Sequence, residues 1–244
     1  MAFSRFNPLA LVADAIFPRT CSACGVAILE QGLSLCWDCR NALSVIAAPF
    51  CKLCGEPVHG LVDHDYVCHD CTKREPVYQR ARAALHYNDA GKHLVISFKY
   101  HHALWLQPLL TDLLEAAVRS HYGDTAYDAV CAVPLHPVKL RERGYNQSAL
   151  LAAGLAKRLG TKVLGRGMIR RIRATPSQTR LTATERLTNV KGAFVVKPSG
   201  FWSGKRLLLV DDVMTTGATV GACARVMLDA GAGYVDVITV ARGY

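Results

Sequence analysis

One stretch of fourteen residues, Leu207 to Val220, constrains the fold of this chain more than any other segment. It begins with a short apolar run of the kind that forms a strand buried on both faces of a parallel sheet. Asp211 and Asp212 follow, and then a turn rich in threonine and glycine leads into a helical pattern that starts near Thr219. This order predicts a strand, a turn and a helix. The two acidic side chains then lie at the carboxyl end of the strand, the edge where open α/β sheets bind ligands.

The chemistry of this segment suits a ribose phosphate. Two adjacent carboxylates can accept hydrogen bonds from the neighbouring hydroxyls of a ribose diol. Small residues let backbone N–H groups converge on a phosphate, and the start of the following helix adds the positive end of its dipole. An ordinary strand, turn and helix with two solvated aspartates is the alternative. It accounts for fewer of these positions, so the segment predicts a site for phosphoribosyl diphosphate (PRPP).

The same segment resembles the PRPP-binding signature of type I phosphoribosyltransferases, which has four apolar residues, two acids, two apolar residues and a threonine-rich turn with glycine. By this resemblance Asp211 and Asp212 are the catalytic candidates and would hold the ribose hydroxyls. The turn would hold the 5′-phosphate. The PRPP-binding residues implied for this turn are Val213, Met214, Thr215, Thr216, Gly217, Ala218 and Thr219.

Four CxxC pairs occupy the first third of the chain and account for eight of its ten cysteines. Two such pairs can supply the four thiolates of a tetrahedral structural zinc site, so four pairs allow two sites. Sequential ribbons, which join the first pair with the second and the third with the fourth, are the simplest arrangement. A cross-braced arrangement, first with third and second with fourth, uses the same residues. The predicted metal ligands are Cys21, Cys24, Cys36, Cys39, Cys51, Cys54, Cys68 and Cys71.

Disulfide bonds and a redox-active CxxC are the alternatives to zinc. The apolar stretch from Leu9 to Phe17 is interrupted by Asp14 and is too short to span a bilayer. No convincing signal cleavage site follows it. We therefore expect a cytoplasmic protein without a membrane span, and in a reducing compartment CxxC spacing indicates metal binding.

Positive charge is concentrated in one part of the chain. The formal net charge is +10, and residues 139–191 contain thirteen lysines and arginines against two acidic residues. Such a segment attracts phosphate-rich ligands, either diphosphate or a nucleic-acid backbone, although a basic surface kept for solubility is the alternative. The candidates for diphosphate binding are Lys139, Arg141, Arg143, Arg173 and Arg180. The last two belong to a polar, threonine-rich segment, residues 170–194, which forms either a lid over diphosphate or a plain surface β-hairpin.

Periodicity and composition predict two domains, a double zinc ribbon over residues 1–74 and an α/β domain over residues 75–244. Metal would supply much of the stability of the smaller domain, because so short a chain builds only a thin core. In the larger domain strands and helices alternate as in a wound parallel sheet. Strands are predicted over residues 81–87, 129–133, 207–210 and 235–241, and helices over residues 106–118, 147–159 and 219–230.

Taken together, the CxxC pairs, the RGYNQ turn that starts at Arg143, the RxxxTPSQ segment that starts at Arg171 and the VDDVMTTGAT loop resemble the ComF family. These are competence-associated proteins that resemble phosphoribosyltransferases, and the family includes gluconate-utilisation-associated members. The resemblance spans nearly the whole chain. It implies an N-terminal double zinc ribbon, a C-terminal domain like that of type I phosphoribosyltransferases, and PRPP binding. It also implies a role in natural transformation and in the use of imported DNA, with other DNA-uptake proteins as partners.

Two functions follow from these patterns. A catalytic site would displace diphosphate from ribose C1, and Mg²⁺ is then expected because it neutralises diphosphate. No residue stands out as a base for the acceptor, and residues 78–127, where an acceptor would be selected, carry no recognisable specificity signature. The alternative is a protein without catalysis, which senses PRPP or a phosphate terminus and holds single-stranded DNA through its zinc module and basic segment.

Overall fold

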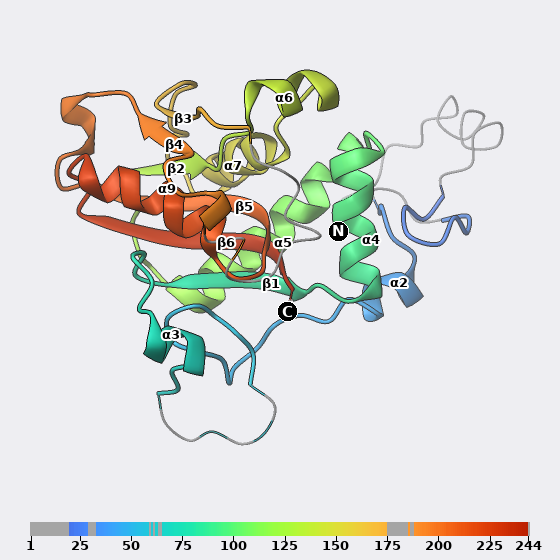
Figure 1. The fold of residues 1–244 in the computed structure, drawn as a ribbon. Helices are drawn as coiled ribbons and strands as arrows, with labels where there is room; N and C mark the ends of the chain where they lie inside the picture. Colours follow the sequence, from blue (N-terminus) through green and yellow to red (C-terminus); the bar gives the residue numbers. More distant parts are fainter. Residues whose placement is uncertain are drawn as a thin grey trace.

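A four-stranded parallel sheet forms the centre of the molecule (Figure 1), with the strand order β1-β6-β5-β2. The computed structural model describes residues 20–28, 33–58, 60, 62, 65–174, 185 and 188–243. The strands of the sheet are β1 (Ala81–His86), β2 (Ala129–Ala132), β5 (Arg206–Met214) and β6 (Tyr234–Arg242). The long central strands β5 and β6 pair over their whole length, which aligns their carboxyl ends at one edge.

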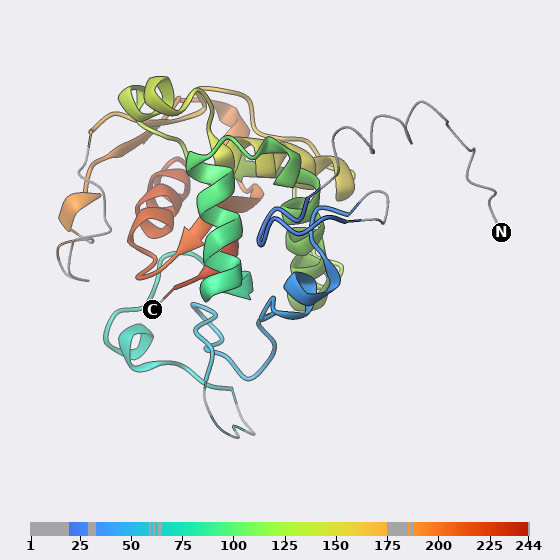
Figure 2. The same ribbon diagram turned by 90° about the vertical axis from the view of Figure 1, so that its right-hand side faces the viewer.

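Helices cover both faces of this sheet, as Figures 1 and 2 show. Along β5, Leu208 and Val210 pack with the helices α5 and α7, while Leu207 and Leu209 pack with α9 on the other face. Side chains alternate between the faces of a strand, so an apolar run without interruption is what a doubly covered strand requires. The helical elements of this region are α4 (Asp89–Tyr100), η1 (Leu104–Leu106), α5 (Gln107–Tyr122), α6 (Pro137–Arg143), α7 (Gln147–Arg158), η3 (Gly200–Trp202) and α9 (Ala218–Asp229).

Local sequence sets the ends of the helices that frame the site. The Asn146 side chain accepts a hydrogen bond from the Ser148 backbone N–H at 3.1 Å and so caps the start of α7. Asn88 caps α4 in the same way, through the N–H of Gly91 at 3.2 Å. Gly144 ends α6 in the left-handed conformation, with φ of 80°. The chain can therefore turn directly from α6 into α7.

The strands and helices predicted for the α/β region are confirmed, but β5 is longer than predicted and the helix α6 was not predicted. The strand predicted over residues 207–210 continues to Met214, because residues beyond Val210 still pair with β6. Asp211 and Asp212 therefore lie inside the last part of β5 rather than after it. The helix α4 was not predicted from the sequence. It contributes a central residue of the candidate site.

The two zinc ribbons lie at different places on the larger region (Figure 2). The first contains α2 (Trp37–Asn41) and lies beside α4, where the His93 ring nitrogen Nε2 is 3.0 Å from the Ser22 carbonyl oxygen. The second contains α3 (His69–Lys73) and backs onto β1, where the Ala81 N–H donates to the Leu53 carbonyl at 2.8 Å. Between the ribbons, the Ile46 N–H donates to the carbonyl of Ala84 at 3.0 Å. The ribbons and their connection thus cover the outer edge of β1, which would otherwise be an open sheet edge.

A separate antiparallel pair, β3 (Ile169–Arg171) with β4 (Phe194–Val196), forms the base of the polar segment proposed as a lid or a hairpin. Most of the segment between these strands, residues 175–184 and 186–187, lies outside the described residues. Across the described residues, no helix combines the length and the apolar character needed to cross a membrane.

Candidate functional site

Asp211 and Asp212 form a buried acidic pair at the carboxyl end of β5, with side chains held by the start of α7. Ser148 Oγ donates to Asp211 Oδ1 at 2.8 Å, and the Asp212 backbone N–H donates to the same oxygen at 3.0 Å. Gln147 Nε2 donates to Asp212 Oδ2 at 3.4 Å. Because Asn146 caps α7, its first two residues, Gln147 and Ser148, are placed directly against the two carboxylates.

Lys99, near the end of α4, is paired with this acidic pair. Its Nζ lies 2.7 Å from Asp212 Oδ2. Burial alone would lower the pKa of Lys99, but the neighbouring carboxylates of Asp212 and Asp211 outweigh it and raise the pKa, so the ammonium group stays charged. Burial, and then the charge of Asp212, raise the pKa of Asp211 to about 7. The site therefore contains a carboxyl group that titrates near neutral pH.

Further cations gather beside the acidic pair. Arg143, at the end of α6, donates from Nη1 to Gln147 Oε1 at 2.5 Å. Burial lowers the pKa of Lys139, and the nearby charges of Arg171 and Arg143 lower it further. Like charges lower a lysine pKa only when they are near, so Arg171, Arg143 and Lys99 all lie near the Lys139 ammonium group. We call the following residues the cationic cluster: Lys99, Lys139, Arg143 and Arg171. Such a cluster suits a ligand with several phosphate charges.

The turn between β5 and α9, residues 215–217, is the turn for which the sequence predicts phosphate binding, and it is called the phosphate loop below. Its last residue, Gly217, has φ of 72°, a left-handed conformation that side chains disfavour. A Cβ atom on Gly217 would also lie only 2.9 Å from Tyr78 Oη. Thr216 Oγ1 accepts a hydrogen bond from the Ala218 N–H at 3.4 Å. The loop thus brings hydroxyl groups and the N-terminus of the twelve-residue helix α9 to the edge where the acidic pair lies.

The structure separates the remaining candidate residues into several groups. Val213 and Met214 belong to β5, and the Met214 side chain is buried in the core. Ala218 and Thr219 begin α9. Arg141 is exposed on α6, while exposed Arg173 donates from Nη1 to the Lys191 carbonyl at 2.6 Å. The last candidate, Arg180, lies outside the described residues.

Sequence reasoning missed four residues of the site, namely Lys99, Gln147, Ser148 and Arg171. For Gln147 and Ser148 the sequence did contain a signal. Asn146 was predicted as a cap, and the first turn after a cap at the carboxyl edge of a sheet points toward ligands. Lys99 offered no comparable signal, because it lies 113 positions before Asp212 in the sequence and only the packing of α4 brings the two together.

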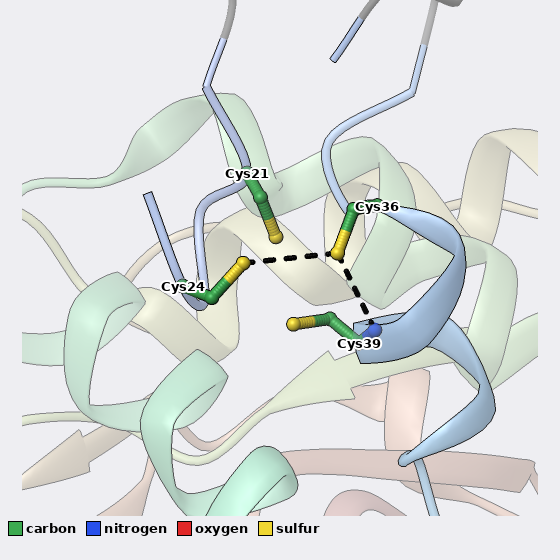
Figure 3. Close-up of side chains that lie close together, drawn as sticks. All are labelled: Cys21, Cys24, Cys36 and Cys39. Carbon is green, nitrogen blue, oxygen red and sulfur yellow. Dashed lines mark hydrogen bonds between the residues drawn. The ribbon is translucent and has the colours of Figure 1, made fainter. Parts of the chain in front are cut away.

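The first zinc ribbon gathers four cysteines around one point, as Figure 3 shows for Cys21, Cys24, Cys36 and Cys39. Their sulfur atoms all lie within 4.8 Å of one another, and Cys24 Sγ is 3.7 Å from Cys36 Sγ. Tetrahedral zinc with bonds of about 2.3 Å needs sulfur atoms roughly 3.8 Å apart. Cys36 is also the N-cap of α2, where its Sγ accepts from the Cys39 N–H at 3.5 Å. The donor set and its spacing fit zinc.

The second ribbon repeats this arrangement with Cys51, Cys54, Cys68 and Cys71. Cys54 Sγ lies 3.6 Å from Cys68 Sγ, and Cys68 is the N-cap of α3. All four cysteines are buried here, whereas Cys24 of the first ribbon is exposed. The structure thus selects the sequential pairing of the CxxC motifs over the cross-braced one.

Comparisons with known proteins agree with both parts of the chain. Residues 12–72 match the family described as a double zinc ribbon domain. The chain is 30% identical over 212 residues to competence protein F of Haemophilus influenzae, covering 85% of this chain and 90% of that protein. The chain belongs to the ComF family. This ComF protein is also 32% identical over 222 residues to the DNA utilization protein YhgH of Salmonella typhi, covering 85% of this chain and 96% of that protein.

Among solved structures, the ComF chain is similar to adenine phosphoribosyltransferase from Thermoanaerobacter pseudethanolicus, with a TM-score of 0.37 and 17% sequence identity. The match covers 59% of this chain and 83% of that one. The fold class expected from the sequence is confirmed by the observed architecture, a parallel sheet flanked by helices with an N-terminal module of two Cys₄ sites.

Proposed function

We propose that this chain binds PRPP at the carboxyl edge of its sheet and transfers the phosphoribosyl group to an acceptor. The observation that carries the proposal is the placement of two buried, adjacent carboxylates between a threonine–glycine loop and the cationic cluster. Asp211 and Asp212 would accept hydrogen bonds from the ribose hydroxyls. The phosphate loop and the start of α9 would hold the 5′-phosphate. The diphosphate would face Lys99, Lys139 and Arg143.

The ion pair between Lys99 and Asp212 must be exchanged for contacts with PRPP when the ligand binds. In the free protein the Lys99 ammonium group pairs with Asp212 Oδ2, the kind of oxygen that a ribose hydroxyl would need. PRPP brings both a diol for the carboxylate and a diphosphate for the ammonium group. In the complex Asp212 would bind the diol and Lys99 would bind the diphosphate. Both groups then keep a partner, so the new contacts offset the free energy lost with their ion pair.

The reaction proposed for the bound ligand is a substitution at ribose C1. The acceptor forms a bond to C1 as the bond from C1 to the diphosphate oxygen breaks, and diphosphate leaves with the bonding electrons. Arg143 and Lys139 would stabilise the charge that develops on the leaving group. Carboxylate oxygens beside phosphate oxygens form the hard donor set that Mg²⁺ prefers, so Asp211 or Asp212 fits as its protein ligand, and the ion would supply further charge neutralisation.

Calorimetry with PRPP and Mg²⁺ tests the pocket directly. We expect the double variant Asp211→Asn, Asp212→Asn to lose PRPP binding, because neutral amides cannot replace two carboxylates as acceptors for the diol. Asp229→Asn, an exposed aspartate at the far end of α9, is the matched control and should bind normally. Unchanged affinity in the double variant would overturn the assignment. Diphosphate release, followed across a panel of nucleobases and small amines, then identifies the acceptor or rules out turnover.

The relatives suggest the process that this site serves. They are named for competence and for DNA utilization. We propose that the chain acts in the cytoplasm, alongside DNA-uptake proteins, where PRPP chemistry supports the use of imported DNA. Transformation and growth on DNA should then fail when the gene is deleted. Wild-type protein should restore them, and the Asp211→Asn, Asp212→Asn protein should not.

A second candidate function is binding of single-stranded DNA without catalysis, and the exposed basic residues Lys157, Arg166 and Arg170 favour it. Arg158 is less suitable for the test, because it pairs with Glu115 on α5 at 3.2 Å. We expect Glu substitutions at the three exposed positions to weaken DNA binding and to flatten its salt dependence by about 0.7 per lost phosphate contact. PRPP affinity should not change. Arg225→Glu, on the exposed side of α9, is the control. DNA binding that survives all three substitutions with the same salt slope would remove this function.

A further inference from the structure

Arg242, in the last position of β6, connects the sheet to the second zinc ribbon. Its Nη2 donates to Cys54 Sγ at 3.5 Å and lies 3.9 Å from Glu56 Oε2. Its side chain is 7% exposed, and within the described residues Nε and Nη1 have no hydrogen-bond partner. A buried guanidinium group with so few partners is unfavourable unless it balances a nearby negative charge. Zinc with four thiolates provides that charge, because four thiolates outweigh one divalent cation.

The backbone beside Arg242 holds the start of the phosphate loop. Arg242 is in register with Met214 on β5, and the next residue, Gly243, donates its N–H to the Met214 carbonyl at 2.9 Å. A Cβ atom on Gly243 would lie 3.3 Å from Thr215 Cγ2, so the two segments are in close contact. Arg242, whose side chain donates to Cys54, is therefore paired with the last residue of β5, and the residue after it contacts the start of the loop.

Tyr78 makes a second connection between the same two places. It is buried in the apolar cluster that includes the four cysteines of the second ribbon. Its hydroxyl lies 2.9 Å from the position of a Cβ atom on Gly217, so it packs directly against the end of the phosphate loop. The first ribbon contacts a different part of the molecule, where Trp105 Nε1 donates to Ser22 Oγ at 2.9 Å.

We propose that the second zinc site is a structural part of the phosphate loop, and that Arg242 and Tyr78 are the positioning residues that couple the two. Loss of zinc from the second site then disorders residues 215–217, whereas loss from the first site leaves them in place. The role of the loop in holding a phosphate rests on the proposed function. The coupling between zinc and loop order does not, so the two are tested by separate measurements.

Zinc release to a chromogenic chelator tests the Arg242 contact. We expect the wild-type protein to release zinc in a fast phase from the exposed first site and a slow phase from the buried second site. Arg242→Met should weaken zinc binding at the second site by about 10- to 100-fold, as loss of an outer-shell partner does, and the slow phase should accelerate. Arg242→Lys, which keeps the charge, should restore part of the retention. Arg206→Met, at the opposite end of the sheet, is the control and should behave like the wild type. A slow phase that is the same in Arg242→Met and in the wild type would overturn the proposal.

Hydrogen exchange tests the coupling to the loop without any ligand. We expect the amides of residues 215–219 to exchange faster in Arg242→Met and in wild-type protein that has lost its second zinc, but not in protein that has lost only the first. Tyr78→Phe removes a single hydroxyl and should speed exchange in the loop while zinc release stays normal. This variant and the partly chelated wild type keep the test valid if Arg242→Met does not fold. Loop exchange that is unaffected by loss of the second zinc would overturn the coupling even if PRPP binds.

Discussion

At the scale of single residues, the main property of the site is the unequal environment of its two carboxyl groups. Both are buried, but the Lys99 ammonium group pairs with Asp212, whereas Asp211 Oδ1 accepts hydrogen bonds from Ser148 and from the Asp212 backbone N–H. Burial and the adjacent charge of Asp212 raise the pKa of Asp211 to about 7, and the charge of Lys99 opposes this rise. Since the folded pKa lies above the unfolded one, this group stabilises the fold at low pH, and its contribution is lost as the pH rises through about 7.

The pH dependence of PRPP binding follows from this pKa. Ionised Asp211 accepts hydrogen bonds from the ribose hydroxyls more strongly than the protonated form, so we expect affinity to rise as the pH passes through about 7. Lys99→Met should move the midpoint of this rise to higher pH, because the ammonium group that lowers the pKa of Asp211 is gone. Calorimetry from pH 6 to pH 8 measures the midpoint. Asp211→Asn controls for titration of the ligand, and a rise of equal size in that variant would contradict the assignment.

At the scale of elements, the site depends on the places where a strand ends and a helix begins. The end of β5 supplies the carboxylates, the capped start of α7 orients them, and the turn into α9 supplies the phosphate loop. These three places meet because parallel strands bring their carboxyl ends to one edge. The short segment from α6 to α7 then adds Arg143, since Gly144 lets the chain reverse direction there.

Alanine substitutions at two glycines, one in the phosphate loop and one inside α9, separate the effect of loop conformation on stability from the effect of helix propensity. Gly217→Ala should lower the free energy of unfolding by about 1–2 kcal/mol, because a side chain disfavours the left-handed conformation. It should also weaken phosphate binding, because the new methyl group would collide with Tyr78 Oη. Gly221→Ala, inside α9 with open space around its Cβ position, should instead stabilise by up to about 1 kcal/mol. Urea unfolding and calorimetry with PRPP measure both effects, and equal behaviour of the two variants would contradict this account.

At the scale of the whole molecule, the zinc ribbons and the α/β region share their cores. Cys21 and Leu35 of the first ribbon belong to the cluster beneath α4 and α5, and the cysteines of the second ribbon belong to the cluster beneath α9. The connection between the ribbons also covers the edge of β1 through the backbone of Ile46. The ribbons therefore contribute to the cores of the larger region, in addition to carrying the two Cys₄ sites.

Because the ribbons and the α/β region share their cores, the structure predicts the stability and the self-association of a fragment of residues 75–244. We expect it to unfold at lower urea concentration than the full chain and to associate with itself, because it exposes the edge of β1 and the apolar surface that Leu35 and Ile46 cover. Urea titration and light scattering measure the two effects. The full chain with both zinc ions is the reference, and a fragment as stable and monomeric as the full chain would show that the two domains are independent.

The metal content is a separate prediction for the intact protein. Two Cys₄ clusters predict two zinc ions per chain in reduced protein. Elemental analysis beside a thiol count gives the stoichiometry. A value near one equivalent would mean that one cluster does not retain zinc. We expect the first to lose its ion before the second, because Cys24 is exposed and all the cysteines of the second are buried.

Features that local chemistry specifies could be predicted from the sequence. Buried strands follow from apolar runs, α7 from its Asn146 cap, the phosphate loop from its small residues, and the zinc sites from CxxC spacing. Three features could be read only from the packed fold, namely which CxxC pairs come together, the pairing of Lys99 with Asp212, and the contact of Arg242 with Cys54. The two side-chain contacts join elements far apart in the chain, and the CxxC pairing is a choice between two arrangements that the same spacing allows. Spacing and periodicity describe neighbours along the sequence, whereas a buried charge finds its partner only after the core has formed.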